Sequence, residues 1–278
     1  MKKFLTALAF IVLAAPVNAQ DRKPSHCIAI ADASPEFRYI QNASFGADLE
    51  PFTVRLSYVS HASFLLEGPQ GFTAVTDYTG FLGDTAFFPT VATMNKAHTT
   101  HWTPNPDPRI PHVLPGWAPD GNNPVEHYLE LGEVLVRNVP TDIRSGFGTV
   151  SEPLGNSIFV FEIAGLCIGH LGHLHHDLSD SQVAALGRLD VVMAPVDGGF
   201  TLPLPNMIAL LKRLRSSVIL PMHWFGEFTL QSFVDGMDDE FRVEWRTDNH
   251  IEVSLRTLPS EPTVIVLRPA WLGNGDEN

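Results

Sequence analysis

The sequence predicts an α/β protein whose sheets are covered by helices. Two observations predict this class. In the first half, segments rich in strand-forming residues alternate with glycine turns. In the second half, short apolar runs alternate with segments whose apolar residues recur at helical spacing. Hairpins followed by strand–helix alternation are typical of sheets that bury a face against helices.

The first half predicts antiparallel hairpins. Residues 53–67 (TVRLSYVSHASFLLE) and 72–78 (FTAVTDY) favour strands, and the Gly-Pro-Gln-Gly turn between them indicates a hairpin. Residues 103–124 are crowded with proline, glycine and asparagine, which predicts a long ordered loop. Strand patterns return in residues 133–140 (EVLVRNVP) and 155–172 (GNSIFVFEIAGLCIGHLG), again with a glycine turn.

The second half alternates strands with helices. Residues 179–189 (SDSQVAALGRL) begin with a serine or aspartate that can cap a helix, and residues 204–215 (LPNMIALLKRLR) also have helical spacing. The short apolar runs at residues 190–196 (DVVMAPV) and 217–224 (SVILPMHW) predict buried strands.

The two ends of the chain predict segments outside the main domain. Residues 1–19 contain two lysines, an apolar run and small residues before the expected cleavage site, which indicates a secretory signal peptide. The apolar run is shorter than the ~18 to 20 residues that span a bilayer. We therefore expect cleavage, no stable membrane anchor and, in a Gram-negative source, a periplasmic protein. The remainder divides into an N-terminal lead-in (20–50), one large domain (51–268) and a loose tail (269–278).

Charge and cysteine content restrict the partners and the redox chemistry. The formal net charge of −13 disfavours binding to nucleic acid or anionic lipid, so we expect a small-molecule substrate. Cys27 and Cys167 could pair in an oxidising compartment. Alternatively, Cys167 lies in an apolar run where an unpaired cysteine would behave as a small buried hydrophobe.

Histidines are concentrated where the predicted strands end. Seven of the twelve lie in three such places, namely His98 and His101, then His170, His173, His175 and His176, and finally His223. In α/β folds the loops at strand ends assemble sites from distant parts of the sequence. Neutral imidazole is a common zinc ligand, so this clustering predicts a metal site. Alternatively, the tract GHLHHD scavenges metal at the surface of a periplasmic binding protein.

The order of four segments resembles the metallo-β-lactamase superfamily. The segments are HASFLLEGPQGFTAVTDY, VATMNKAHTTH, CIGHLGHLHHDLSDSQVAALGRLDVVMAPVDGG and VILPMHW. The branch that they resemble most is that of ascorbate-6-phosphate-lactonase-like hydrolases. The resemblance implies an αββα sandwich of two mixed sheets covered by helices, with a metal site at one edge. It also implies that a metal-bound hydroxide attacks a small-molecule ester, and a lactone or other cyclic ester is the expected substrate.

The resemblance also assigns metal ligands. The family's first metal loop, His-x-His-x-Asp-His, falls on Lys96, His98, Thr100 and His101, so two of its four ligands are replaced. A further family histidine is expected near residue 142, where this chain has Asp142.

The remaining ligands follow later strands. The family's bridging aspartate falls on His173, and its final histidine falls on His223. The expected ligands are then His98, His101, His173 and His223. Because they are all imidazoles and a second metal position has lost its histidine, one zinc ion is expected rather than two, with manganese as an alternative.

Three further residues, Lys96, Asp77 and His61, are expected to act in catalysis. The ammonium of Lys96 could replace the missing metal as a tethered cation, holding an anionic group or stabilising a developing oxyanion. Alternatively, Lys96 is a solvated lysine in an inactive homologue. Asp77 matches an aspartate that braces the metal loop, although an ordinary turn aspartate gives the same pattern. His61 matches a histidine near the active-site edge, and Asp197 could orient the same pocket.

Overall fold

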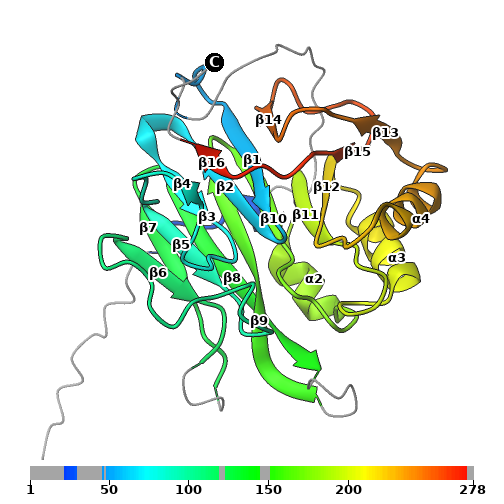
Figure 1. Cartoon of the computed structure of the whole chain (residues 1–278), viewed down its shortest axis with the longest axis horizontal. Helices are drawn as coiled ribbons and strands as arrows, with labels where there is room; N and C mark the ends of the chain where they lie inside the picture. The colour runs from blue at the N-terminus through cyan, green and yellow to red at the C-terminus, as the bar shows by residue number, and fades with distance from the viewer. Residues whose placement is uncertain (1–21, 30–45, 47, 119–122, 145–150, 274–278) are drawn as a thin grey trace, which may run out of the picture.

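The computed structural model describes residues 22–29, 46, 48–118, 123–144 and 151–273. The predicted signal peptide, residues 1–19, lies outside the described residues, as does most of the lead-in at 20–50. Two sheets stack face to face, and helices cover the free face of the larger sheet (Figure 1). No helix in the described ranges is long and apolar enough to span a bilayer.

One sheet has six strands and contains the N-terminal hairpins. In spatial order its strands are β14 (His250–Val253), β1 (Val54–Ser60), β2 (Ser63–Glu67), β3 (Thr73–Val75), β5 (Val91–Met94) and β6 (His112–Pro115). The hairpin predicted across the Gly-Pro-Gln-Gly turn is confirmed as the antiparallel pair β2–β3, with the 3-10 helix η1 (Pro69–Gly71) in its turn. β3, β5 and β6 then pair in parallel.

The other sheet has eight strands. In spatial order they are β13 (Arg242–Trp245), β15 (Thr263–Val266), β12 (Val218–Met222), β11 (Val191–Pro195), β10 (Leu166–His170), β9 (Ser151–Ile163), β8 (Val134–Arg144) and β7 (Tyr128–Leu131). The strands from β13 to β10 are parallel, and those from β10 to β7 are antiparallel.

Three helices pack on the outer face of the eight-stranded sheet, namely α2 (Asp180–Leu186), α3 (Leu204–Leu214) and α4 (Glu227–Met237). Helix α2 begins where the sequence predicts, because the Ser179 hydroxyl accepts from the Gln182 N–H while the Gln182 side chain accepts from the Ser179 N–H. Helices α3 and α4 bury Met207, Leu211 and Phe233 against the sheet.

The central apolar core lies between the two sheets. Strand alternation places Leu56 and Phe64 on the inner face of the six-stranded sheet, opposite Phe159, Phe161 and Met193 of the eight-stranded sheet. All five side chains are fully buried. This core holds the two sheets in a fixed relation, and it therefore also positions the loops at their ends.

The outer face of the six-stranded sheet differs from the expectation. Leu65, Val75 and Ala92 point away from the central core and are buried under loops whose side chains include Phe87 and Trp102. Within the described part of the chain, no helix contributes to this layer. Helical cover therefore holds for one sheet only, because the loops after β3 and β5 supply aromatic side chains that bury the other sheet.

Three local expectations are corrected. The strand segment predicted at 53–67 turns at His61 and forms both β1 and β2. The loop predicted at 103–124 includes β6, which pairs with β5. The tail expected to be loose contributes β16 (Leu272–Gly273), which pairs with β4 (Gly83–Asp84), and Leu272 is buried. The last two pairings depend on partners elsewhere in the chain, which a local pattern does not reveal.

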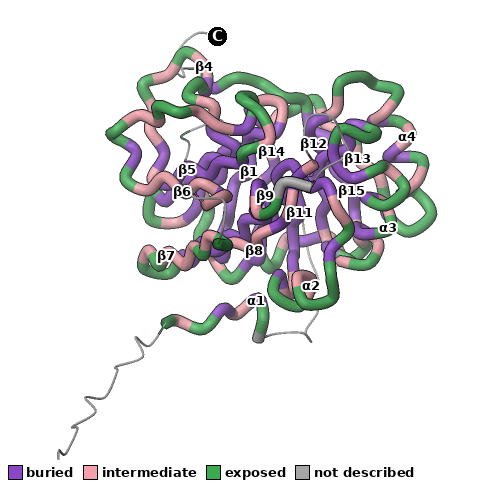
Figure 2. Tube along the Cα trace, turned by 90° about the horizontal axis from the view of Figure 1, so that it is seen from below, coloured by how far each residue is buried: buried purple, intermediate pink, exposed green. Residues whose placement is uncertain are grey.

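A disulfide joins the lead-in to the main domain. Cys27, in the short helix α1 (His26–Ala29), is bonded to Cys167 in β10, and their Cα atoms are 5.8 Å apart. Ser25 Oγ and the His26 N–H both donate to the Glu162 carboxylate on the neighbouring strand β9. Figure 2 shows α1 beside α2 at this side of the molecule. Of the two alternatives for the cysteines, the structure has the pair.

Candidate metal centre

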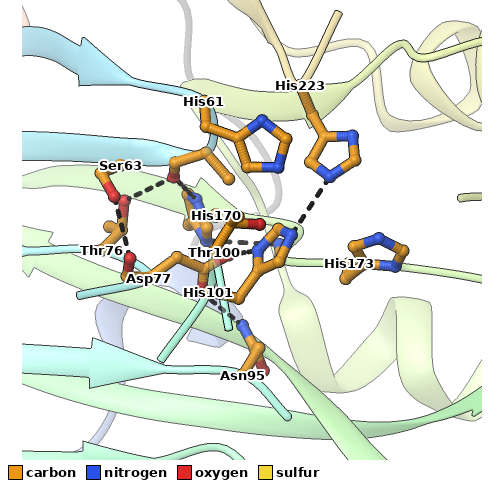
Figure 3. A network of polar contacts seen from close by, with 12 residues as sticks. His61, Ser63, Thr76, Asp77, Asn95, Thr100, His101, His170, His173 and His223 are labelled. Atoms are coloured by element: carbon orange, nitrogen blue, oxygen red, sulfur yellow. Dashed lines mark hydrogen bonds and ion pairs between the residues drawn. The ribbon is translucent and has the colours of Figure 1, made fainter. Parts of the chain in front are cut away.

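Loops at the ends of strands from both sheets meet at one edge of the sandwich. The six-stranded sheet contributes His61 after β1, and His98 and His101 after β5. The eight-stranded sheet contributes His173 after β10 and His223 after β12. Figure 3 shows the rings of His61, His101 and His223 turned toward one another, with His173 beside them. The structure thus brings together all four histidines predicted as ligands, and it adds His61.

The loop after β5 is closed by its own backbone. The Asn95 N–H donates to the His101 carbonyl at 3.2 Å, and the His101 N–H donates to the His98 carbonyl at 2.9 Å. The Lys96 N–H donates to the Gly155 carbonyl in β9 at 3.1 Å. These bonds place the ring centroids of His98 and His101 4.6 Å apart.

Two carboxylates determine which ring nitrogens of His101 and His223 carry protons. His101 Nδ1 lies 2.5 Å from Asp77 Oδ2, and His223 Nδ1 lies 2.8 Å from Asp197 Oδ2. An ionised carboxylate can only accept, so His101 carries its proton on Nδ1. The close Asp197 oxygen favours the same tautomer for His223, although the angle of that contact lies outside hydrogen-bond geometry. In this tautomer each Nε2 of a neutral ring presents a lone pair. The two Nε2 atoms are 3.1 Å apart. Two lone pairs at this separation repel each other unless both bind a cation.

His98 and His173 make a second pair of this kind. Their Nε2 atoms are also 3.1 Å apart. Thr100 Oγ1 lies 2.7 Å from His98 Nδ1, so the residue that replaces the family's aspartate contacts a predicted ligand. His173 Nδ1 is buried and has no hydrogen-bond partner in the structure.

The backbone before His173 requires glycine. Gly172 has φ +59°, and a Cβ on it would lie 2.4 Å from Asn95 Nδ2 and 2.5 Å from Asn156 Oδ1. The same Asn156 Oδ1 accepts from the His173 N–H at 2.8 Å. The Gly-His pair in HLGH therefore lets the chain pass between two buried amides, which aims His173 at the cluster.

His61 completes the cluster. One nitrogen from each of His61, His98, His101 and His223 lies within 4.8 Å of the others. The His61 carbonyl accepts from the His223 N–H at 2.8 Å and from the Tyr58 hydroxyl at 2.7 Å, while its Nε2 is buried without a partner. His61 and His223 both have left-handed backbones, with φ +44° and +58°. Such strain in non-glycine residues is concentrated at functional sites.

Desolvation favours the neutral form of four imidazoles in the cluster, those of His61, His98, His101 and His173. Desolvation, followed by the charge of His223, lowers the pKa of His98 and holds the pKa of His101 well below its usual range. Desolvation also lowers the pKa of His173, and together with His223 it lowers the pKa of His61 to about 4. Neutral imidazole is the form that binds metal ions.

Asp77 is held by more than its contact with His101. The Asn95 amide donates to Asp77 Oδ1 at 2.8 Å, and Asn95 Oδ1 in turn accepts from the Ser157 N–H at 2.7 Å. Burial raises the pKa of Asp77 to about 6, whereas the Asn95 amide favours its ionised form. The sequence did not identify Asn95, although it ends the apolar run of β5 directly before Lys96.

Asp197 connects His223 to an adjacent turn. Its Oδ1 accepts from the backbone N–H groups of Gly199, Phe200 and Thr201 at 2.8, 2.7 and 3.1 Å. Burial opposes ionisation, but the hydrogen bonds from His223 and from this backbone outweigh it and hold the pKa of Asp197 below its usual range. One carboxylate thus orients both a candidate ligand and the Asp-Gly-Gly turn.

Other predicted residues lie outside the ring of nitrogens. Lys96 is an exposed residue at the start of the loop. Asp142 accepts from the Leu154 N–H across β8 and β9, so it has a structural contact.

His170 Nε2 donates to the Ala62 carbonyl at 2.8 Å, while its Nδ1 accepts from a backbone N–H. His175 Nδ1 accepts from the Arg144 N–H. Two of the clustered histidines therefore support the fold instead of facing the centre.

Comparisons with known proteins agree with this architecture. A family model described as a beta-lactamase superfamily domain matches residues 55–223. The chain belongs to the beta-lactamase superfamily. A candidate Zn-dependent hydrolase of the metallo-beta-lactamase superfamily from Thermotoga maritima has a similar structure, with 26% identity, a TM-score of 0.56, and coverage of 77% of this chain and 98% of that chain.

A second similar structure supports the fold alone. It is a candidate metal-dependent hydrolase from Parabacteroides distasonis, with 13% identity, a TM-score of 0.51, and coverage of 67% of this chain and 89% of that chain. No curated protein matches this chain significantly. The superfamily and the mixed α/β fold predicted from sequence are thereby confirmed.

The side chains of this superfamily member fit a metal ion. Two nitrogens bound to one tetrahedral zinc at ~2.0–2.1 Å lie ~3.3 Å apart. The Nε2 separations of the pairs His98–His173 and His101–His223 are both 3.1 Å. His61 Nε2 is a further buried nitrogen without a partner. Nitrogens that converge in this way form a donor set for a borderline divalent cation, and His98, His101 and His223 each have an oxygen beside the opposite ring nitrogen.

Proposed function

We propose that the protein is a metal-dependent hydrolase that acts on a small-molecule ester, and that its substrate is a lactone or other cyclic ester. One observation carries the proposal. His101 Nε2 and His223 Nε2 lie 3.1 Å apart, while the Nδ1 atom of each ring lies beside a carboxylate oxygen. No hydrogen bond between neutral rings accounts for that arrangement, whereas shared binding of a cation does.

His98, His101 and His223 would hold the ion together with His61, because one nitrogen from each lies within 4.8 Å of the others. His173 lies outside this group, but its Nε2 is 3.1 Å from His98 Nε2, and we propose it as a further ligand. Zinc suits this all-imidazole set best, with manganese as the alternative, and one ion is proposed. When bound, such an ion acts as a Lewis acid and lowers the pKa of a coordinated water to about 7.

The protein's own residues supply the arrangement. The oxygens of Asp77 and Asp197 beside the Nδ1 atoms of His101 and His223 favour the tautomer with the proton on Nδ1, so that each Nε2 presents a lone pair. The full burial of His101 and His223 excludes bulk water from one side of the cluster. Low exposure strengthens electrostatic interactions with a reacting group.

The proposal also covers the cellular location and the class of substrate. Export to a periplasm, the ascorbate-6-phosphate-lactonase-like branch and the absence of a nucleic-acid substrate remain proposals, supported by residues 1–19, by the quoted motifs and by the net charge of −13. A surface metal scavenger is disfavoured, because that role needs exposed histidines and both His173 and His175 are buried. An inactive homologue is the remaining alternative.

A metal count combined with a substrate panel tests the proposal. The protein, expressed without residues 1–19 and reconstituted with zinc or manganese, is expected to bind about one ion and to hydrolyse lactones faster than phosphodiesters or β-lactams. Elemental analysis and initial rates measure the two properties. An absence of metal after reconstitution would refute the site, and bound metal with only background rates on every class would favour the inactive homologue.

Lys96 provides a prediction of its own. If its ammonium stabilises a developing oxyanion, Lys96→Ala should retain the metal and lose turnover by ~10²- to 10³-fold, because a cation is removed and no ligand is touched. Lys96→His restores the family's imidazole and should raise the metal count toward two. Metal analysis and kcat measure these effects.

A matched control for Lys96 is Lys23→Ala. Lys23 is a partly exposed lysine that pairs with Glu133, on the far side of the sandwich from the histidines. This change should alter neither metal content nor turnover. If Lys96→Ala and Lys96→His behave like the control, Lys96 is a solvated lysine and takes no part in the reaction.

A further inference from the structure

Two exposed aromatic rings lie directly beside the histidine cluster. Phe225 is 62% exposed and Phe200 is 70% exposed, and their ring centroids are 5.7 Å apart in an edge-to-face arrangement. The Phe225 centroid is 5.2 Å from that of His223 and 5.6 Å from that of His61. An apolar surface therefore begins at the edge of the candidate metal centre.

The backbone under Phe200 is held from both sides. Its N–H donates to Asp197 Oδ1 at 2.7 Å, and its carbonyl accepts from Arg144 Nη2 at 3.1 Å and from His175 Nε2 at 2.9 Å. Arg144 Nη2 also donates to the carbonyls of Gly199 and Thr201. These bonds position the backbone from which the exposed Phe200 ring projects.

The backbone under Phe225 is positioned by its neighbours. It lies two residues after His223, whose N–H donates to the His61 carbonyl, and just before α4. The two rings also share an anchor, because Asp197 contacts His223 through Oδ2 and holds the Phe200 N–H through Oδ1. The same carboxylate therefore contacts a candidate metal ligand and positions the backbone of Phe200.

We propose that Phe200 and Phe225 form an aromatic shelf that binds the apolar chain of the substrate while its ester lies at the histidines. This inference rests on the proposed hydrolase function and narrows its substrate class to neutral esters or lactones with an alkyl or aryl substituent. Exposed aromatic rings gain free energy when an apolar group covers them. The net charge of −13 further disfavours a strongly anionic substrate.

The test uses γ-lactones whose side chains range from methyl to octyl. With the metal-loaded protein, kcat/KM should rise by up to about fourfold for each CH₂ that leaves water on the shelf, mainly through KM. The Phe200→Ala/Phe225→Ala double variant should keep its metal content and lose this dependence on length, so that its kcat/KM is the same for the methyl and the octyl lactone.

Phe52→Ala is the matched control. Phe52 is 69% exposed, and it precedes β1 whereas His61 follows it, so the two ends of that strand lie ~20–30 Å apart. The control variant should keep the full length dependence. If the dependence survives in the double variant, or if the wild type shows none, the shelf proposal is overturned while hydrolysis stands.

A binding measurement separates the shelf from the hydrolase. Isothermal titration calorimetry with γ-lactams that carry the same side chains measures binding alone, so it does not depend on hydrolysis of the lactones. Binding that strengthens with chain length in the wild type and not in the double variant supports the shelf, even if no lactone is hydrolysed. Lactams that fail to bind at millimolar concentration, or that bind independently of chain length, overturn it.

Discussion

Replacing His101 by alanine is expected to remove the metal from the purified protein and to abolish measurable hydrolysis. Loss of an outer partner of a ligand typically costs ~10–100-fold in metal affinity, and loss of a direct ligand should cost more. His101 is fully buried, and its Nε2 faces that of His223 at 3.1 Å, so no solvent-exposed group can take its place without rearrangement. Elemental analysis and a competition titration with a chelator measure the loss.

The His101→Ala variant also leaves the Asp77 carboxylate buried without its partner, which could destabilise the fold. A second variant, His101→Ala with Asp77→Asn, removes that charge and should remain folded by circular dichroism, yet be metal-free. His112→Ala serves as the control, because His112 lies on β6, the edge strand of the six-stranded sheet. The His112→Ala variant should bind metal as the wild type does. A folded His101 variant with about one tightly bound ion would show that the ligand assignment is wrong.

Reduction of the Cys27–Cys167 disulfide is expected to lower the free energy of unfolding by ~2–5 kcal/mol. The bond joins residues 140 apart in sequence, so it removes many conformations from the unfolded chain. It also attaches the lead-in to a central strand. At ~2–4 °C per kcal/mol for a domain of this size, Tm should fall by ~4–20 °C in reductant.

Thermal unfolding with and without reductant measures this effect. The Cys27→Ser/Cys167→Ser double variant should have the Tm of the reduced wild type both with and without reductant. A wild type whose Tm is unchanged, although thiol titration finds both cysteines free, would show that the disulfide does not contribute to stability. The histidine cluster has no cysteine, so metal content provides an independent check that the site survives.

The sequence by itself determined much of the local structure. The cap at Ser179 and the helical spacing that follows it specify α2, and the apolar runs before His223 and Cys167 specify central strands. These features are decided by contacts within a few residues, and sequence patterns report such contacts directly. The same local reasoning placed His98, His101, His173 and His223 at strand ends, where the structure has them.

Only the tertiary structure decided which of these groups meet. The Nδ1 contacts of His101 with Asp77 and of His223 with Asp197 depend on how two sheets stack, as do the proximity of His61 and the bond between Cys27 and Cys167. Local patterns also did not indicate that β16 pairs with β4 or that aromatic loops replace a helical layer. The physical reason is that hydrogen bonds and packing between residues far apart in sequence form only once the core has fixed the strands, so no short segment carries their signature.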